Sequence, residues 1–364
     1  MRNVTLILGA GASFNYKAPL MKDFYRVAIE LFTTENNSNL IDHYKVVFSF
    51  MDLLQKSQAK ANLDLHNVEQ VYTALEMARM LNLESLKVKG VSWARMEESM
   101  RYFLTKTIES RVKLPISDNF YKPVRDYDEP MFLDGGSTNE DLAQAIEHVT
   151  TLKEFGWGVT IITFNYDLVI ESLLATHGLE ADYGLGSERL SPFTSVPLLK
   201  LHGSINWERK DRKIHAYKYF EKDKRIGSTN PMFHVDSSHN VTTSFSENIV
   251  PFVIPPVWNK SNYQSQLSNV WRRAAASLSQ TSHLYAAGYS LPQTDGFFKQ
   301  LYALGTVGTA PLMEFGVFDI EPKETAYGVN ARFADLLGRG AENVYQYYDG
   351  GLGNLATRLF ELHY

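Results

Sequence analysis

Two apolar runs in this sequence end on polar side chains whose types could take part in chemistry. Residues 158–167, GVTIITFNYD, place Thr163, Asn165 and Asp167 after an apolar run, and residues 196–204, VPLLKLHGS, end on His202 and Gly203. A carboxamide can hold a water or a hydroxyl without being ionised. A histidine beside a flexible turn can titrate near neutral pH and act as a base. These residue types suit a site that positions a reactant and moves a proton.

Each of these residues also has an ordinary structural interpretation. Asn165 can be a turn residue, and His202 can be a hydrogen-bonded structural group. Asp167 precedes the helical stretch LVIESLLATHG and suits its N-cap. The spacing alone leaves these alternatives open.

A glycine-rich turn follows the first apolar run. In VTLILGAGASFNY, residues 4–16, Gly9 and Gly11 precede Ser13, and an amphipathic helix is predicted from about Met21 to Phe32. Glycines let backbone amides approach a phosphate closely. However, Phe14 departs from the usual dinucleotide fingerprint, and no strand-ending acidic residue follows about 20 positions on. The motif indicates either a nucleotide loop or a tight structural turn.

Two later apolar runs also end on polar residues. HLYAAGYS, residues 283–290, ends on Gly288 and Ser290, which could receive a phosphate or a ribose. MEFGVFD, residues 313–319, ends on Asp319, and carboxylates in such places often accept ribose hydroxyls. Asp295 is predicted to cap a helix that begins at Gly296.

The elements that carry these residues alternate between strands and helices. The short apolar runs VTLIL, VTIITF, LLKL, VPFVI, LYAAG and MEFGVF read as strands, and their alternation with helical stretches predicts a parallel α/β sheet. The long separation of the first two strands predicts a largely helical insertion, residues 35–150, within a single domain, 1–364. It includes helices over 67–81, capped by Asn67, and over 92–112. Residues 114–140 read as an exposed connection.

Composition and charge narrow the class of protein. The chain has 364 residues, 44% of them hydrophobic, which suits a large buried core. Its net charge of -5 provides no global basic field, so direct nucleic-acid binding is not expected, although residues 218–225 form a local basic cluster. Cysteine is absent, which excludes thiolate metal sites and disulfides and fits the cytoplasm. HVDSSH, residues 234–239, is only loosely metal-like, and no window is apolar enough to span a membrane.

Taken together and in this order, the strand ends resemble the sirtuin superfamily. GAGAS resembles its cofactor-binding start, TFNYD its Thr-x-Asn-x-Asp motif, LHGS its catalytic His-Gly, and GYSL its later Gly-Thr-Ser-type motif. VFDIE stands where the family places a ribose-contacting strand end. The likeness covers residues 9–17 and 159–320. It implies a Rossmann-like parallel sheet flanked by helices, the sirtuin-type NAD-binding fold, with a helical insertion after the first strand.

The positions at which the chain departs from the family's motifs indicate which branch of the family it resembles. Protein-deacylating sirtuins carry a cysteine-ligated zinc module after the His-Gly, whereas this chain has no cysteine and a polar stretch at 206–248. We therefore expect no zinc. With Phe164 and Tyr166 in its motif, the chain resembles bacterial sirtuin-like effectors of anti-phage defence that cleave NAD. The resemblance thus implies an NAD glycohydrolase (NADase).

The resemblance also implies a role for each residue. Asn165 would orient the water and the nicotinamide ribose, and His202 would act as the base. Gly9, Gly11 and Ser13, with Ser290, would hold the phosphates, and Asp319 the adenosine ribose. The full set expected to bind NAD is Gly9, Ala10, Gly11, Ser13, Thr163, Asp167, Gly203, Gly288, Ser290 and Asp319. Nicotinamide leaves NAD as a neutral molecule, so no pair of carboxylates is required.

Other functions stay open at this stage. The chain could be an NAD-dependent protein deacylase or ADP-ribosyltransferase, or a non-catalytic NAD-sensing module. An unrestrained NADase would poison its own cell, so we expect gating by a homo-oligomer or by a protein partner, with the helical insertion as the contact surface. The resemblance suggests a HerA-type hexameric ATPase as that partner.

Overall fold

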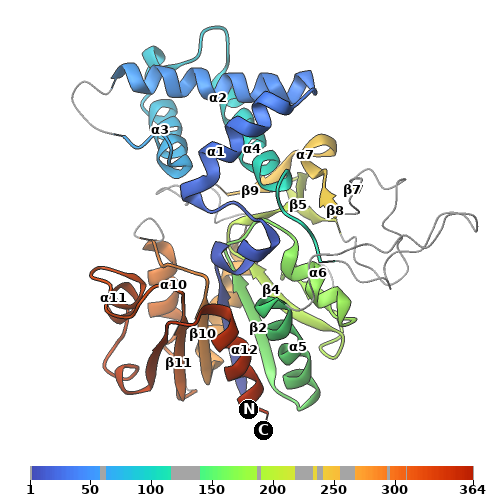
Figure 1. Cartoon of the computed structure of the whole chain (residues 1–364), viewed down its shortest axis with the longest axis vertical. Helices are drawn as coiled ribbons and strands as arrows, with labels where there is room; N and C mark the ends of the chain where they lie inside the picture. Colours follow the sequence, from blue (N-terminus) through green and yellow to red (C-terminus); the bar gives the residue numbers. More distant parts are fainter. Residues whose placement is uncertain are drawn as a thin grey trace, which may run out of the picture.

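The centre of the molecule is a seven-stranded parallel sheet (Figure 1). The structure is a computed structural model that describes residues 2–57, 63–115, 140–186, 190–217, 233–235, 241–254, 267–292, 296–308 and 310–363. The strand order is β12-β11-β10-β1-β2-β4-β3. The strands are β1 (Asn3–Leu8), β2 (Gly158–Thr163), β3 (Glu180–Asp182), β4 (Ser195–Lys200), β10 (His283–Ala287), β11 (Glu314–Phe318) and β12 (Tyr345–Tyr348). The predicted parallel α/β sheet is confirmed.

Strand β1 occupies the middle of this sheet. Its last residue, Leu8, is in register with Thr163 of β2 on one side and with Ala287 of β10 on the other. Five of its six residues are buried, as expected for a strand covered on both faces. The chain leaves β1 toward β2, while β10 lies on the opposite side, so the order of strands reverses here. Ligands of open α/β sheets bind at such a point, outside the carboxyl ends of the strands.

Helices flank the sheet. They are α5 (Asp141–Glu154), α6 (Val169–Thr176), α9 (Ser268–Gln280), α10 (Gly296–Gly305), α11 (Val329–Ala334) and α12 (Gly351–Glu361), with short 3-10 turns η1 (Ala10–Tyr16) and η4 (Glu342–Val344). Helices α5 and α12 pack against each other in front of the sheet (Figure 1). The start predicted at Gly296 is the start of α10. None of the described helices combines the length and apolarity needed to cross a bilayer.

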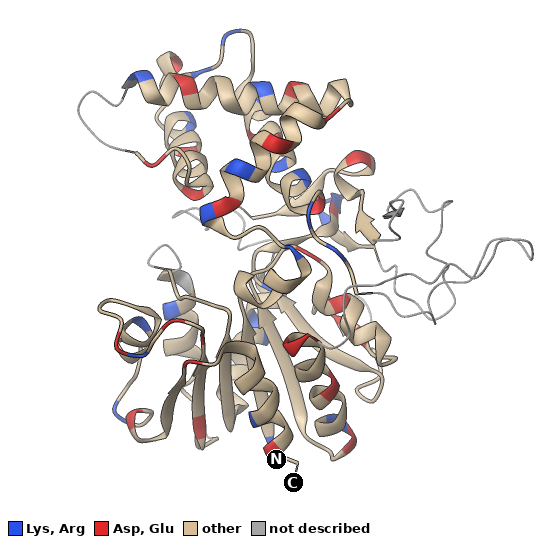
Figure 2. Cartoon of the chain, in the orientation of Figure 1, with Lys and Arg blue, Asp and Glu red and all other residues tan. Residues whose placement is uncertain are grey.

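A separate helical layer lies beyond the carboxyl ends of the strands, at the top of Figure 1. It comprises α1 (Met21–Thr34), α2 (Ser38–Ser57), η2 (Glu84–Leu86), α3 (Val68–Met80) and α4 (Trp93–Glu109). Tyr44 and Phe103 pack with their ring centroids 4.9 Å apart inside it. The Asn67 side chain accepts hydrogen bonds from two amides of α3, as predicted for its N-cap. Acidic and basic residues are mixed along these helices (Figure 2).

The helical layer does not include all of residues 35–150. Helix α5 begins within that range and ends at Glu154, and because it packs on β2 and α12 it flanks the sheet instead. The connection expected at 114–140 lies almost wholly outside the described residues, as do residues 218–225, Asp295 and His239. What the sequence predicts for these residues stays a prediction.

Smaller antiparallel elements lie between the sheet and the helical layer. They are β5 (Gly203–Lys210) paired with β6 (Lys213–Ala216) and β9 (Pro251–Val253), and β7 (Phe233–Val235) paired with β8 (Val241–Thr243), followed by α7 (Phe245–Asn248). The run VPFVI, predicted as part of the parallel alternation, is β9, so that prediction was wrong. A short buried strand reads alike in both kinds of sheet, because apolar runs do not record strand direction.

Candidate functional site

The polar residues after β2 are fastened to the end of β1. The hydroxyl of Thr163 donates to the carbonyl of Leu8 over 2.7 Å and accepts from the Asn165 amide over 3.1 Å. Thr163 is fully buried. It therefore fixes where the chain turns after β2 and brings Asn165 to the end of the neighbouring strand.

Asn165 has one fixed orientation. Its Nδ2 donates to the carbonyl of Gly9 and to the hydroxyl of Ser13, each over 3.0 Å. Its Oδ1 is buried and has no hydrogen-bond partner among the described residues. An unpaired buried acceptor costs about 1–3 kcal/mol. A ligand hydroxyl or water that donated to this oxygen would remove that cost.

Ser13 and Asp167 continue the same hydrogen-bond chain. Ser13 is fully buried, and its hydroxyl donates to Asp167 Oδ1 over 3.2 Å. That oxygen also accepts from the Val169 amide at the first turn of α6, so Asp167 caps the helix from one residue before the N-cap position, Leu168. Burial raises the pKa of Asp167, and the nearby Lys200 ammonium opposes this rise. The hydroxyl proton of Ser13 is thus donated to Asp167 within the protein.

The glycines after β1 meet the turn after β10. A Cβ on Gly9 would lie 2.4 Å from the Gly288 carbonyl oxygen, and one on Gly288 would lie 2.3 Å from the Ala12 nitrogen. The Gly11 amide donates to the Gly288 carbonyl over 2.9 Å. Only glycines allow this approach, and Gly288 also has a φ of 58°. The motif thus forms a tight turn packed on Gly288, and Ala10, between the glycines, is exposed.

His202 stands on a segment next to Asn165. The Leu201 amide donates to the carbonyl of Thr163 over 2.9 Å, which aligns the end of β4 with the segment that carries Asn165. The His202 ring lies edge to face with Phe164, with 5.1 Å between centroids, and the residue is 4% exposed. Gly203 then turns the chain with a φ of 82°. The two predicted catalytic residues thus share one edge of the sheet.

Ser290 and Asp319 lie further along the same edge, after β10 and β11. Ser290 is exposed, and its carbonyl accepts from Arg332 Nε over 2.7 Å. Asp319 is half-buried; its Oδ1 accepts from the Glu321 amide over 2.9 Å, and burial raises the pKa of this carboxyl. An open cavity beside Ser290 is lined by Pro292, Tyr327, Ala331, Arg332 and Asp335. Only Ser290 of the two lines this cavity, and among the described residues no hydrogen bond joins either of them to the chain of contacts around Asn165.

Sequence reasoning missed a buried ion pair behind Asn165. Lys200, at the end of β4, is 1% exposed, and its ammonium lies 2.8 Å from the Glu171 carboxylate of α6. It also donates to the carbonyl of Asp167. A lysine inside LLKL and a glutamate inside VIESLL were the available signals, because charged residues are almost never fully buried unless they are paired.

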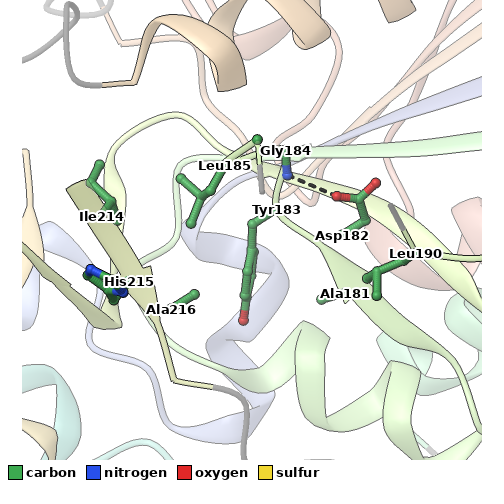
Figure 3. Close-up of a pocket in the computed structure, with 10 residues that line it drawn as sticks. Ala181, Asp182, Tyr183, Gly184, Leu185, Leu190, Ile214, His215 and Ala216 are labelled. Atoms are coloured by element: carbon green, nitrogen blue, oxygen red, sulfur yellow. Dashed lines mark hydrogen bonds between the residues drawn. The ribbon is translucent and has the colours of Figure 1, made fainter. Parts of the chain in front are cut away.

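A further cavity of about 160 Å³ lies between β3 and β6 (Figure 3). Tyr183 stands at its centre, with β6 on one side and Asp182 on the other. Asp182 is bound by both terminal nitrogens of Arg273, at 2.9 and 2.7 Å. None of the predicted site residues lines this cavity, and the described residues contain no cluster of three or more potential metal ligands.

The chain was compared with family models, curated proteins and solved structures. No family model matches the chain, and no curated protein matches it. Solved structures do match: a mutant Sir2 homologue in complex with ADP ribose is 11% identical, with a TM-score of 0.42 over 99% of this chain and 91% of the other. A Sir2 homolog in complex with NAD is 12% identical, with a TM-score of 0.41 over 100% and 91%. Sir2Tm bound to a propionylated peptide is 14% identical, with a TM-score of 0.36 over 99% and 93%.

Proposed function

We propose that this chain is an NAD glycohydrolase that cleaves the bond between nicotinamide and ribose, giving nicotinamide and ADP-ribose. The observation that carries the proposal is the Asn165 carboxamide. Its two N–H groups are taken by Gly9 and Ser13, and its buried oxygen is left as an acceptor at the carboxyl edge of the sheet. A ribose hydroxyl or the attacking water would supply the missing donor.

The roles of the other residues follow from how the bond between nicotinamide and ribose is broken. Nicotinamide leaves with the bonding electron pair and is neutral, because its nitrogen was cationic in NAD. Positive charge then develops on the ribose, a water attacks its anomeric carbon, and a base must accept the proton of that water. His202 is our candidate base, since it lies on the segment hydrogen-bonded to that of Asn165. No acid is required for the leaving group.

The substrate would extend along the edge of the sheet. We propose that the turn after β1 and Ser290 hold the phosphates, with Ala10 exposed between the two glycines. Asp319 would accept the adenosine ribose hydroxyls. The geometry modifies one expectation: the Ser13 hydroxyl already donates to Asp167 and accepts from Asn165, so we assign Ser13 to holding Asn165 rather than to holding a phosphate.

The test is nicotinamide release from NAD without any peptide, followed by chromatography. We expect Asn165→Ala and His202→Ala to lose cleavage by about 10²–10⁴-fold, the usual contribution of a positioned acid–base group. His215→Ala, an exposed histidine on β6, is the matched control and should cleave normally. If His202→Ala cleaved NAD as fast as the wild type, His202 would not be the base. Turnover that required an added acyl-peptide would instead favour a deacylase.

We further propose that the enzyme is a gated effector of bacterial anti-phage defence that acts in the cytoplasm. Its activity would depend on assembly of several copies or on a HerA-type hexameric ATPase, with the helical layer as the contact surface. The support is indirect: NAD destruction is harmful unless it is restrained, and α1–α4 form a layer distinct from the helices that flank the sheet. Tight NAD binding without product under any trigger would point to a sensing module.

A further inference from the structure

The buried ion pair between Lys200 and Glu171 has no task in the chemistry proposed above. Their side chains are 1% and 4% exposed, with 2.8 Å between the ammonium and the carboxylate. Replacing such a pair by apolar residues of similar size is often neutral or stabilising, because the desolvation of two charges offsets their attraction. Stability alone therefore does not account for it.

The pair touches the backbone of the site. The Lys200 ammonium donates to the carbonyl of Asp167, two residues after Asn165, while Lys200 itself lies two residues before His202. One side chain thus ties together the two segments that carry the candidate catalytic residues. Glu171 is held in turn by the hydroxyl of Tyr183 over 3.1 Å, which fixes the pair from the side of β3.

The charge of Lys200 also bears on the direction of a hydrogen-bond chain. Burial raises the pKa of Asp167, and the Lys200 ammonium is the largest influence that opposes this. While Asp167 is ionised, it can only accept, so Ser13 must donate to it and accept from Asn165. The Gly9 carbonyl, which can only accept, holds the Asn165 carboxamide in the same orientation.

We propose that Lys200 and Glu171 are positioning residues, which hold Asp167 against the end of β4 so that Asn165, two residues earlier, keeps its place beside Gly9 and Ser13. This inference rests on the proposed function. It assigns no contact between Lys200 and NAD. It predicts that losing the pair impairs the reaction through Asn165 while the fold survives.

The experiment compares two double variants that each remove one ion pair. Lys200→Met/Glu171→Leu removes the pair behind the site. Arg358→Met/Glu314→Leu removes the 2.7 Å pair between α12 and the first residue of β11, at the opposite edge of the sheet, and is the matched control. Melting temperature, kcat and KM for nicotinamide release are measured for both. In Lys200→Met/Glu171→Leu we expect kcat to fall about 10²-fold, as for a misplaced catalytic group, and KM to change by less than about threefold. In the control variant we expect kcat to stay at the wild-type value.

Two further measurements make the inference decisive. Because Lys200 is argued to act through Asn165, adding Lys200→Met to Asn165→Ala should cause no further loss of kcat. Losses that multiply, or an unchanged kcat in Lys200→Met/Glu171→Leu, would overturn the proposal. If Lys200→Met alone does not fold, the apolar double variant and its combination with Asn165→Ala give the same comparison.

An NMR readout separates this inference from the proposed function. Should the wild type release no nicotinamide under any trigger, the proposed function fails, and the side-chain amide signals of ¹⁵N-labelled Asn165 still report on its hydrogen bonds to Gly9 and Ser13. We expect these signals to shift and to exchange faster with water in Lys200→Met/Glu171→Leu but not in the control variant. Unchanged signals would overturn the positioning role even if NAD were cleaved.

Discussion

The Asn165 side chain has a role in the fold, and we propose that it also serves the site. Its two donors join the turns after β1 and β2, so a role in packing is secure. The same contacts leave its oxygen buried and unpaired among the described residues, which packing alone does not require. If Asn165 only shaped a turn, an oxygen exposed to water would avoid the free-energy cost of an unpaired buried acceptor.

Gly203 is predicted to be irreplaceable for a steric reason. It has a φ of 82°, and a Cβ there would lie 2.3 Å from the carbonyl oxygen of Phe252 in β9. We expect Gly203→Ala to lower stability by more than the roughly 1 kcal/mol that strain at positive φ costs, measured by denaturant unfolding. Gly178→Ala, with a φ of 70° and open space around it, is the control for strain without a clash. Equal losses in the two variants would contradict the steric argument.

At the residue scale, the sequence indicated the strand-end residues but not their partners. The sequence indicated Asn165, His202 and Gly203 as candidate site residues because polar side chains and a glycine follow apolar runs there. The pairing of Ser13 with Asp167 joins residues that lie 154 positions apart, and no local pattern encodes such a contact. Lys200 and Glu171 were read as ordinary members of a strand and a helix, since only the fold shows that they face each other.

Helix α2 carries a buried histidine that should make the helical layer sensitive to acid. His43 hydrogen-bonds to Ser99 of α4 over 3.1 Å and stacks on Tyr102, with 4.2 Å between centroids. Burial, assisted by Arg95, lowers the pKa of His43 to about 4 from an ordinary 6.5. Between these values the unfolded state binds the proton and the folded state does not, so stability falls as the pH falls from 6.5 to 4.

The measurement is the melting temperature of wild type and His43→Gln across this range. Glutamine keeps a hydrogen-bonding group but does not titrate. We expect the wild type to lose more degrees than the variant between about pH 6.5 and 4.5, at roughly 2 °C for each kcal/mol in a chain of this size. The difference between the two proteins should be constant above pH 7, which serves as the internal control. Parallel curves throughout would show that His43 is not responsible.

At the element scale, apolar runs located five of the seven strands of the main sheet. The other two, β3 and β12, are short edge strands; β3 has only three residues, and none of them is buried. Periodicity reports burial and not the partner of a strand, which is why β9 was assigned to the parallel sheet. The same limit applies to α5: its amphipathic pattern shows that one face is buried but not that the face covers β2.

At the scale of the whole molecule, the gating proposal predicts a link between assembly and activity. We expect the purified protein either to form a particle of more than one copy or to cleave NAD only after a partner is added. Mass photometry across a dilution series, with nicotinamide release measured on the same samples, tests this. Cleavage per copy should fall when dilution separates the copies. A monomer that is active at every concentration would contradict the proposal.

The central position of β1 has a consequence for how the protein is made. This strand is synthesised well before its two partners, which begin at residues 158 and 283. Contacts between residues so distant in sequence form slowly, because a long loop must close before they stabilise the chain. The turn after β1 also needs Gly288 against it before the edge near Asn165 is complete. A ribosome-bound chain therefore completes the edge near Asn165 only after residue 288 has been synthesised.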